Sequence, residues 1–130
     1  MLTYTISELA REFDITPRAI RFYEDQGLLT PARTGAGGRV RVYAARDRTR
    51  LKLTLRGKRL GLSLAEIRAL VDMYDSPKDS GPQMQRFLDV LARHRLTLEQ
   101  QREDIAVALA EINLHEAECR RLLGAVAGID

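Results

Sequence analysis

The C-terminal third of this 130-residue chain constrains its fold most, because the stretch from Pro82 to about Leu123 has no interrupting Pro or Gly. It predicts one helix of roughly 40 residues, about 60 Å long. Every seventh residue is apolar: Met84, Leu91, Leu98, Ile105, Ile112 and Cys119. Such a repeat is typical of a coiled coil. A small head cannot cover this seam, so we expect the same helix of a second subunit to bury it.

The second row of this repeat is mixed, since charged residues interrupt the apolar ones. It consists of Leu88, Arg95, Arg102, Leu109, Glu116 and Leu123. Two other arrangements therefore stay open. The helix could fold back on its own head, or break into a hairpin near residues 93–95.

The composition favours a mostly α-helical fold. Apolar residues make up 45% of the chain but aromatic residues only 5%, which suits helices rich in Leu, Ile and Ala better than a β-sandwich. Charged residues reach 30%, above the ordinary share of about 25%. The core is therefore expected to be modest, and a partner subunit would help to complete it.

The net charge of +3 is distributed unevenly along the chain. Residues 1–61 carry 13 Lys and Arg against 6 Asp and Glu, a net of +7, whereas residues 62–130 carry 8 against 12, a net of −4. A basic head on an acidic tail suggests that the head meets a polyanion. An ordinary solvated basic surface is the simpler alternative.

Two short helices are predicted near the N-terminus. Residues 5–8 read Thr-Ile-Ser-Glu, a capping box that opens the first helix. Thr16 is a suitable N-cap for the second, and Pro17 suits its first turn. Gly27 is a suitable stop for that helix. Two helices joined by a few residues form a helix-turn-helix pattern.

A small hairpin, or wing, is expected next. Residues 28–31 are predicted to be extended, residues 35–38 form a Gly-rich turn, and residues 39–43 alternate as a strand does. The alternation places Arg39 and Arg41 on one face. Since an isolated hairpin is marginally stable, Val40, Val42 or both should pack on the helices.

Two further helices complete the predicted head. One covers residues 45–60, with Leu51 and Leu55 on its inner face, and Gly57 weakens it somewhat. The other begins with a capping box at residues 63–66. Its apolar stripe consists of Leu64, Ile67, Leu70 and Val71.

We therefore predict a DNA-binding head at residues 1–75, a linker at 76–81, and a dimerisation helix with its tail at 82–130.

The second helix carries the side chains best suited to DNA. Thr16 and Arg18 stand at its leading end, which usually touches bases in a helix-turn-helix. Arg21 and Tyr23 follow about one turn later, where phosphate contact is plausible. Simpler interpretations of both arginines are a solvated surface, or pairing with Glu24 or Asp25. Ile20 and Phe22 are assigned to the core.

The motifs of the head resemble those of the MerR family of regulators. They are residues 5–10 (TISELA), residues 16–24 (TPRAIRFYE) followed by Gly27-Leu28-Leu29, residues 41–43 (RVY), and residues 60–67 (LGLSLAEI). The match covers residues 3–71 and continues more loosely into the long helix. The Ile-Arg-Phe-Tyr-Glu run followed by Gly-Leu is specific.

This resemblance implies a winged helix-turn-helix homodimer whose long helices pair antiparallel. Each head would bind half of a near-palindromic promoter site, and DNA distortion would control transcription by RNA polymerase. The resemblance assigns base reading to Arg18. It assigns the sugar-phosphate backbone to Tyr23, Arg41, Tyr43 and Arg56.

The chain departs from the metal and redox sensors of that family. Their cysteines at the start of the long helix are missing, since residues 76–90 contain none. Cys119, the single cysteine, is interpreted as a small apolar residue of the seam. His94 and His115 are about 30 Å apart on one helix and cannot share a metal within one chain. No metal and no cofactor is predicted.

A small-molecule effector would have to bind between the fourth helix, the linker and the long helix. The apolar candidates are Met73, Tyr74, Phe87 and Leu88, with core packing as the simpler interpretation. Residues 4–8 and 51–59 resemble the subgroup that controls leucine, isovalerate and acyclic terpenoid breakdown. That resemblance implies an effector of the acyl-CoA type.

Two competing functions were weighed. An excisionase-like or architectural protein would bend DNA without sensing anything. An enzyme has little support, because no phosphate loop, Cys/His pair or carboxylate dyad is recognisable.

The N-terminus does not resemble a signal peptide, and no uncharged stretch approaches the roughly 20 residues that span a bilayer. We therefore expect a cytoplasmic protein.

Overall fold

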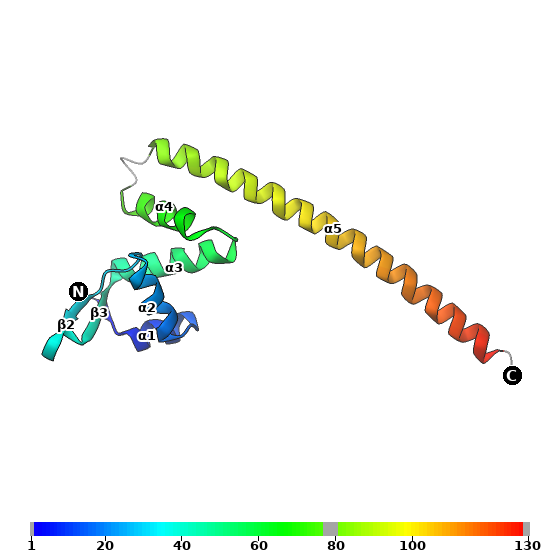
Figure 1. Ribbon diagram of the computed structural model, residues 1–130, viewed down its shortest axis with the longest axis horizontal. Coiled ribbons are helices and arrows are strands. Elements are labelled where there is room, and N and C mark those ends of the chain that lie inside the picture. Colours follow the sequence, from blue (N-terminus) through cyan, green and yellow to red (C-terminus); the bar gives the residue numbers. More distant parts are fainter. Residues whose placement is uncertain (1, 77–80, 129–130) are drawn as a thin grey trace. The chain divides into compact units, whose positions relative to one another are not determined.

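The computed structural model describes residues 2–76 and 81–128, which form helices and a small sheet (Figure 1). Its contacts divide the chain into two compact units, Met1–Val90 and Leu91–Asp130. The predicted fold class, mostly helical with a small wing and a long C-terminal helix, is confirmed. Within the described ranges, no helix is long and apolar enough to cross a membrane.

The head begins with strand β1 (Thr3–Tyr4) and the predicted helix pair, α1 (Ile6–Phe13) and α2 (Pro17–Asp25). The capping box of α1 is present: the Glu8 amide donates to Thr5 Oγ1 at 3.1 Å and the Thr5 amide to Glu8 Oε1 at 2.9 Å. Thr16 caps α2. Both starts follow from local side chains that satisfy free amides.

The wing consists of β2 (Ala32–Thr34) and β3 (Val40–Ala44), joined by a turn that contains the short 3₁₀ helix η1 (Ala36–Gly38). β1 pairs with the other side of β3, which gives an antiparallel sheet of order β1-β3-β2. The sequence did not predict β1, because two residues carry no periodic signal.

Two expectations about the wing were wrong. The strand lies at Ala32–Thr34 rather than 28–31, because Leu28 and Leu29 are each only 1% exposed and belong to the core. Arg39 precedes β3 in an α-like conformation and is not part of the strand. Of the two valines expected to pack on the helices, Val40 is 51% exposed and Val42 is half-buried. Tyr43 is fully buried and anchors the sheet.

Helices α3 (Ala45–Arg59) and α4 (Leu64–Asp75) pack on each other (Figure 1). Leu51 is fully buried as predicted. Gly57 serves as a contact point: a Cβ built on it would lie 2.8 Å from Ile67 Cγ1. The close approach of the two helices explains a glycine that sequence reasoning treated only as a weak point.

Two buried charged residues of α3 tie the head together. Asp47 accepts hydrogen bonds from the Thr30 amide at 3.0 Å and the Ala44 amide at 3.2 Å. Arg50 donates through Nε to the Leu28 carbonyl at 2.6 Å. Among the described residues, no buried side-chain polar atom lacks a hydrogen-bond partner. The head therefore satisfies its own polar groups.

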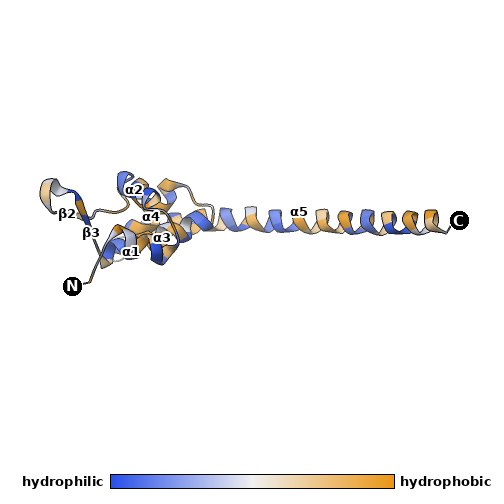
Figure 2. Cartoon of the chain, turned by 90° about the horizontal axis from the view of Figure 1, so that it is seen from below, coloured by the Kyte–Doolittle hydropathy of each residue, from blue (hydrophilic) through white to orange (hydrophobic). Residues whose placement is uncertain are grey.

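Helix α5 (Gly81–Ala127) is continuous over 47 residues. The alternative of a hairpin broken near residues 93–95 is wrong, because these residues lie inside the helix. The helix continues past the predicted end at Leu123, through Gly124. Of its described residues only Phe87 is buried. Figure 2 shows apolar and polar residues interspersed along α5.

The predicted seam of α5 is exposed in the single chain. Leu98, Ile105 and Ile112 are each about half exposed, at 50%, 59% and 52%. Met84 is 39% exposed, Leu91 is half-buried and Cys119 is exposed. The predicted linker lies largely outside the described residues, which end at Ser76 and resume at Gly81.

Candidate nucleic-acid interface

The outer face of α2 carries two arginines and an aromatic ring. Arg18 and Arg21 are exposed, and neither forms an ion pair within the described part of the chain. Phe22 is 46% exposed, so its assignment to the core was wrong. Ile20 and Tyr23 take the inner positions, whereas Phe22 follows Arg18 by four residues and shares its face. That spacing was the signal available in the sequence.

The leading end of α2 is organised by Thr16. Its Oγ1 accepts a hydrogen bond from the Ala19 amide at 3.1 Å. This bond fixes the first turn of the helix, while the other free amides at this end and the helix dipole favour an anion. Thr16 and Arg18 therefore stand together at an end suited to a phosphate or a base edge.

Glu24 joins α2 to the wing. Its Oε1 accepts a hydrogen bond from Arg33 Nη2 of β2, and its Oε2 accepts one from Arg41 Nε of β3, each at 2.7 Å. The Tyr43 hydroxyl donates to Oε2 at 3.5 Å. Sequence reasoning considered Glu24 as a partner of Arg18 or Arg21. The structure pairs it with the wing instead, because the hairpin returns to the end of α2.

Two tyrosines assigned to the DNA backbone are buried. Tyr23 is 3% exposed, and its hydroxyl accepts a hydrogen bond from Lys58 Nζ at 3.5 Å. Tyr43 is 0% exposed. Burial, with the nearby Glu24 charge, raises the pKa of Tyr43 to about 12. Contact of either tyrosine with DNA stays a prediction, and both have partners inside the head.

The cations of the head fall into two groups. One group forms ion pairs with carboxylates: Arg33 and Arg41 with Glu24, Arg46 with Asp75, Arg50 with Asp72 and Asp75, and Arg48 with Glu12. The other group consists of exposed arginines without an ion pair inside the described ranges. It includes the predicted residues Arg18, Arg21, Arg39 and Arg56. These four are available to an external anion.

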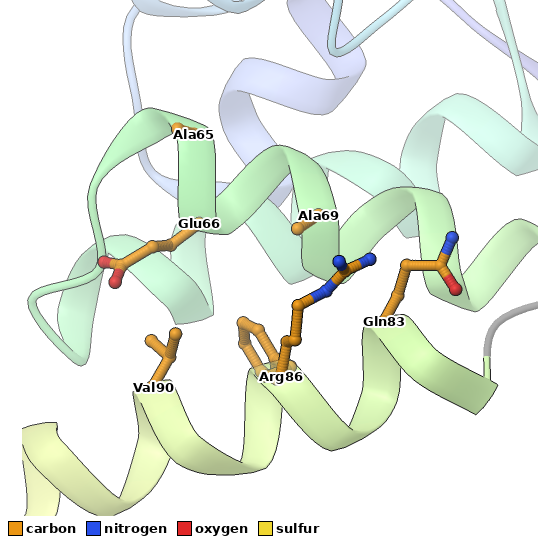
Figure 3. Close-up of a pocket in the computed structure, with 7 residues that line it drawn as sticks. Ala65, Glu66, Ala69, Gln83, Arg86 and Val90 are labelled. Carbon is orange, nitrogen blue, oxygen red and sulfur yellow. The ribbon is translucent and has the colours of Figure 1, made fainter.

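A hollow lies between α4 and the first turns of α5, and Figure 3 shows the side chains that line it. Its volume is about 280 Å³. Ala65, Ala69, Phe87 and Val90 form its apolar walls; Glu66, Gln83 and Arg86 add polar groups. The arrangement suits a small apolar group, with one acidic and one basic side chain beside it.

The residues predicted to hold an effector do not line one common space. Phe87 lines the hollow of Figure 3, whereas Met73 and Tyr74 line a second hollow of about 560 Å³ with Leu70 and Met84. Leu88 is 57% exposed and lines neither. Sequence reasoning missed the small residues of α4 and Arg86, because no pattern within one helix shows which side chains meet across two.

No group of three potential metal-binding side chains occurs among residues 2–76 and 81–128. His94 and His115 both lie on α5, and Cys119 is exposed there.

The fold and this surface define a winged helix-turn-helix DNA-binding protein. Two family models match the chain: a MerR helix-turn-helix family regulatory protein over residues 4–74, and a MerR DNA-binding model over residues 48–114. The chain belongs to the MerR family of DNA-binding transcription regulators, a regulatory rather than an enzymatic class.

Individual proteins agree with this membership. The chain is 34% identical over 110 residues to the transcriptional regulator CueR of Salmonella typhimurium, covering 82% of this chain and 78% of the relative. A MerR-family regulator from Bacillus cereus has a similar structure, with a TM-score of 0.67, 31% identity, and coverage of 86% of this chain and 78% of that one.

A further structure of the same fold is HiNmlR, a MerR-family regulator lacking the sensor domain, bound to promoter DNA. Its TM-score is 0.61 at 23% identity, covering 83% of this chain and 79% of that chain.

Proposed function

We propose that this chain is a homodimeric, sequence-specific regulator that binds a pseudo-palindromic promoter site and distorts it in response to a small molecule. The observation that carries the proposal is the outer face of α2, where Arg18 and Arg21 stand exposed and unpaired beside the capped helix start. An α-helix with cationic side chains at its leading end fits the major groove.

Within this surface, Arg18 and Thr16 would read base edges. Arg21, Arg39 and Arg56 would bind phosphates, since each is exposed and has no carboxylate partner in the described chain. Tyr23, Arg41 and Tyr43 were assigned to the same backbone. Both tyrosine hydroxyls and Nε of Arg41 have partners inside the head, so the exposed arginines are the first to test.

The homodimer is proposed from the exposed seam of α5. Apolar side chains recur every seven residues from Met84 to Cys119, and most stay accessible in the single chain. A long amphipathic helix is stabilised mainly by packing its apolar stripe. An antiparallel pair of α5 helices would bury this stripe and connect two heads across one operator.

Distortion of the operator would link binding to transcription. Bending a site of this length costs on the order of 1–6 kcal/mol, which two firmly held heads can supply. The proposed outcome is a promoter whose elements are realigned for RNA polymerase, in the cytoplasm where the chromosome lies.

For the effector we propose a molecule of the acyl-CoA type, bound in the hollow of Figure 3. Its apolar walls suit a short acyl chain, and Arg86 offers a cation for a phosphate of the coenzyme A part. Assignment to the leucine, isovalerate and terpenoid subgroup is part of this proposal. A ligand at 100 times its Kd should stabilise the protein by about 2.7 kcal/mol. A thermal-shift series with acyl-CoA thioesters, against free CoA, tests this; no shift with any thioester would remove this effector class.

The DNA-binding experiment starts by selecting the preferred duplex from a random library with the full chain. Arg18→Ala should cost roughly 1–3 kcal/mol on that duplex and relax the preference at one base position of each half-site. Arg56→Ala should weaken all duplexes alike and flatten the salt dependence of binding. Selection of no preferred sequence, or equal loss of selectivity in both variants, would contradict the proposal.

A further inference from the structure

Glu24 holds three side chains of the wing at once. Arg33 belongs to β2, whereas Arg41 and Tyr43 belong to β3, and all three direct a donor to one carboxylate at the C-terminal part of α2. The Glu24 side chain is only 12% exposed. Both of its oxygens are used, so this contact fixes the position of the hairpin against the helix.

The same contact engages one nitrogen of each of two arginines, Nη2 of Arg33 and Nε of Arg41, and partly neutralises their charge. Charge-assisted bonds of 2.7 Å are stronger than bonds between neutral groups. Arg33 or Arg41 would have to release Glu24 before it could face a phosphate fully. Release would leave a largely buried carboxylate without its partner, next to the negative charge of DNA, and both effects are unfavourable.

We propose that Glu24 is a positioning residue that determines specificity: it fixes the wing to α2 and withholds Arg33 and Arg41 from DNA phosphates. This inference rests on the proposed DNA-binding function. Phosphate contacts raise affinity for every sequence alike. A head that keeps two wing arginines neutralised therefore binds random DNA less tightly, and its choice of sequence depends more on α2.

The head contains a matched control for this contact. Asp75 of α4 also binds two arginines, Arg46 at 2.7 Å and Arg50, and its side chain is 20% exposed. None of these three residues belongs to α2 or the wing. Asp75→Asn therefore changes the net charge and frees arginines just as Glu24→Gln does, but at another place.

The experiment measures binding of the full chain to the selected duplex and to a scrambled duplex of equal length, by fluorescence anisotropy between 50 and 300 mM KCl, conditions chosen to expose the salt effect. On the scrambled duplex, Glu24→Gln should bind more tightly than the unmodified chain. The log–log salt slope of the dimer should be steeper by about two to four, because each added phosphate contact contributes about 0.9 and each of the two heads frees two arginines. The ratio of specific to random affinity should fall. Asp75→Asn should leave the slope unchanged.

Several outcomes would overturn the inference. One is a salt slope for Glu24→Gln that matches the slopes of Asp75→Asn and the unmodified chain. Another is a uniform weakening on both duplexes with a lower melting temperature, as expected of a purely structural residue.

Arg33→Gln gives a second test that does not need Glu24 altered. The inference predicts an unchanged slope on the scrambled duplex for this variant, and a slope of the dimer flattened by about two would contradict it. If the unmodified chain binds neither duplex, the proposed DNA-binding function is itself wrong. A failure of the Glu24 inference alone is distinct, because the unmodified chain then still binds DNA.

Discussion

The exposure of apolar side chains differs between two regions of the molecule. These are the head, up to Val90, and the outer part of α5, from Leu91 onward. In the head, Leu9, Ile20 and Leu51 are each 0% exposed. Along the outer helix, Leu96 is 67% and Leu114 is 72% exposed. The same types of residue are thus enclosed in one region and open to solvent in the other.

This difference indicates that the head closes a core of its own, whereas the outer helix leaves its apolar side chains to the partner helix of the proposed dimer. The head satisfies its buried polar groups and closes its own core. The ion pairs of the outer helix, such as Arg120–Glu116 and Arg121–Glu118, join neighbours on one surface. Such exposed pairs contribute little to stability, so in the proposed dimer the burial of the apolar stripe is the main source of stability for this helix.

The largest effect is expected for a substitution that prevents two α5 helices from pairing. Ile105→Asp places two charges in the proposed seam, and burial of each ion costs several kcal/mol. Sedimentation should then show monomers. Gln101→Asp introduces the same charge at an exposed polar position and should leave dimers intact. A dimer that persists in the Ile105 variant would mean that the seam is elsewhere.

The same substitution should have opposite effects in the two regions. Gly57→Ala forces a Cβ to within 2.8 Å of Ile67 in the packed head, and overpacking typically costs about 1–3 kcal/mol. Gly124→Ala meets nothing within 4 Å and should stabilise the helix by about 1 kcal/mol. Thermal unfolding followed by circular dichroism measures both. A Gly57 variant as stable as the unmodified chain would contradict the close packing of α3 on α4.

Phe22 sharpens the comparison, because its apolar side chain is exposed in the region that encloses Leu9, Ile20 and Leu51. Its ring stands edge-on to Tyr23, with centroids 5.6 Å apart. If the ring faces DNA, Phe22→Ala should weaken operator binding by about 1 kcal/mol through loss of an apolar base or sugar contact. The dimer should persist on sedimentation. Unchanged affinity in anisotropy titrations would exclude Phe22 from the interface.

The smallest effect concerns Asp75, whose pKa is held below its ordinary value by the hydrogen bond from Arg46 and by the nearby Arg50. A carboxylate with a lowered pKa stabilises the fold fully above its unfolded pKa, and this contribution is lost as the pH falls through the folded pKa. Asp75→Asn should therefore lower the free energy of unfolding at pH 7 by about 1 kcal/mol or less. The difference in stability between the variant and the unmodified chain should disappear as the pH falls below about 4. A gap of constant size down to pH 2.5 would contradict the ion pair.

Local signals account for what could be predicted from the sequence. The capping boxes at Thr5 and Ser63 determine helix starts through bonds between residues three apart. The lack of Pro and Gly from Pro82 to about Leu123 predicted one long helix, although α5 continues to Ala127. In contrast, Glu24 meets arginines 9 and 17 residues away. No spacing rule shows which of many arginines a glutamate will bind.

Only part of the candidate site could be predicted, because only part of it depends on local geometry. The exposure of Arg18 and Arg21 follows from helix geometry within α2. The burial of Tyr43 depends on how the wing folds onto the helices, and the hollow of Figure 3 depends on contacts between α4 and α5. Neither arrangement is encoded within a single element.

The central claim, two heads on one operator, is tested most directly by counting chains on DNA. Light scattering coupled to size-exclusion chromatography gives the mass of the complex with the selected duplex. The account predicts two chains on each full duplex. A duplex of half the length should bind one chain, with much lower affinity than the full duplex. A complex of one chain on the full duplex, with undiminished affinity for the half-length duplex, would contradict it.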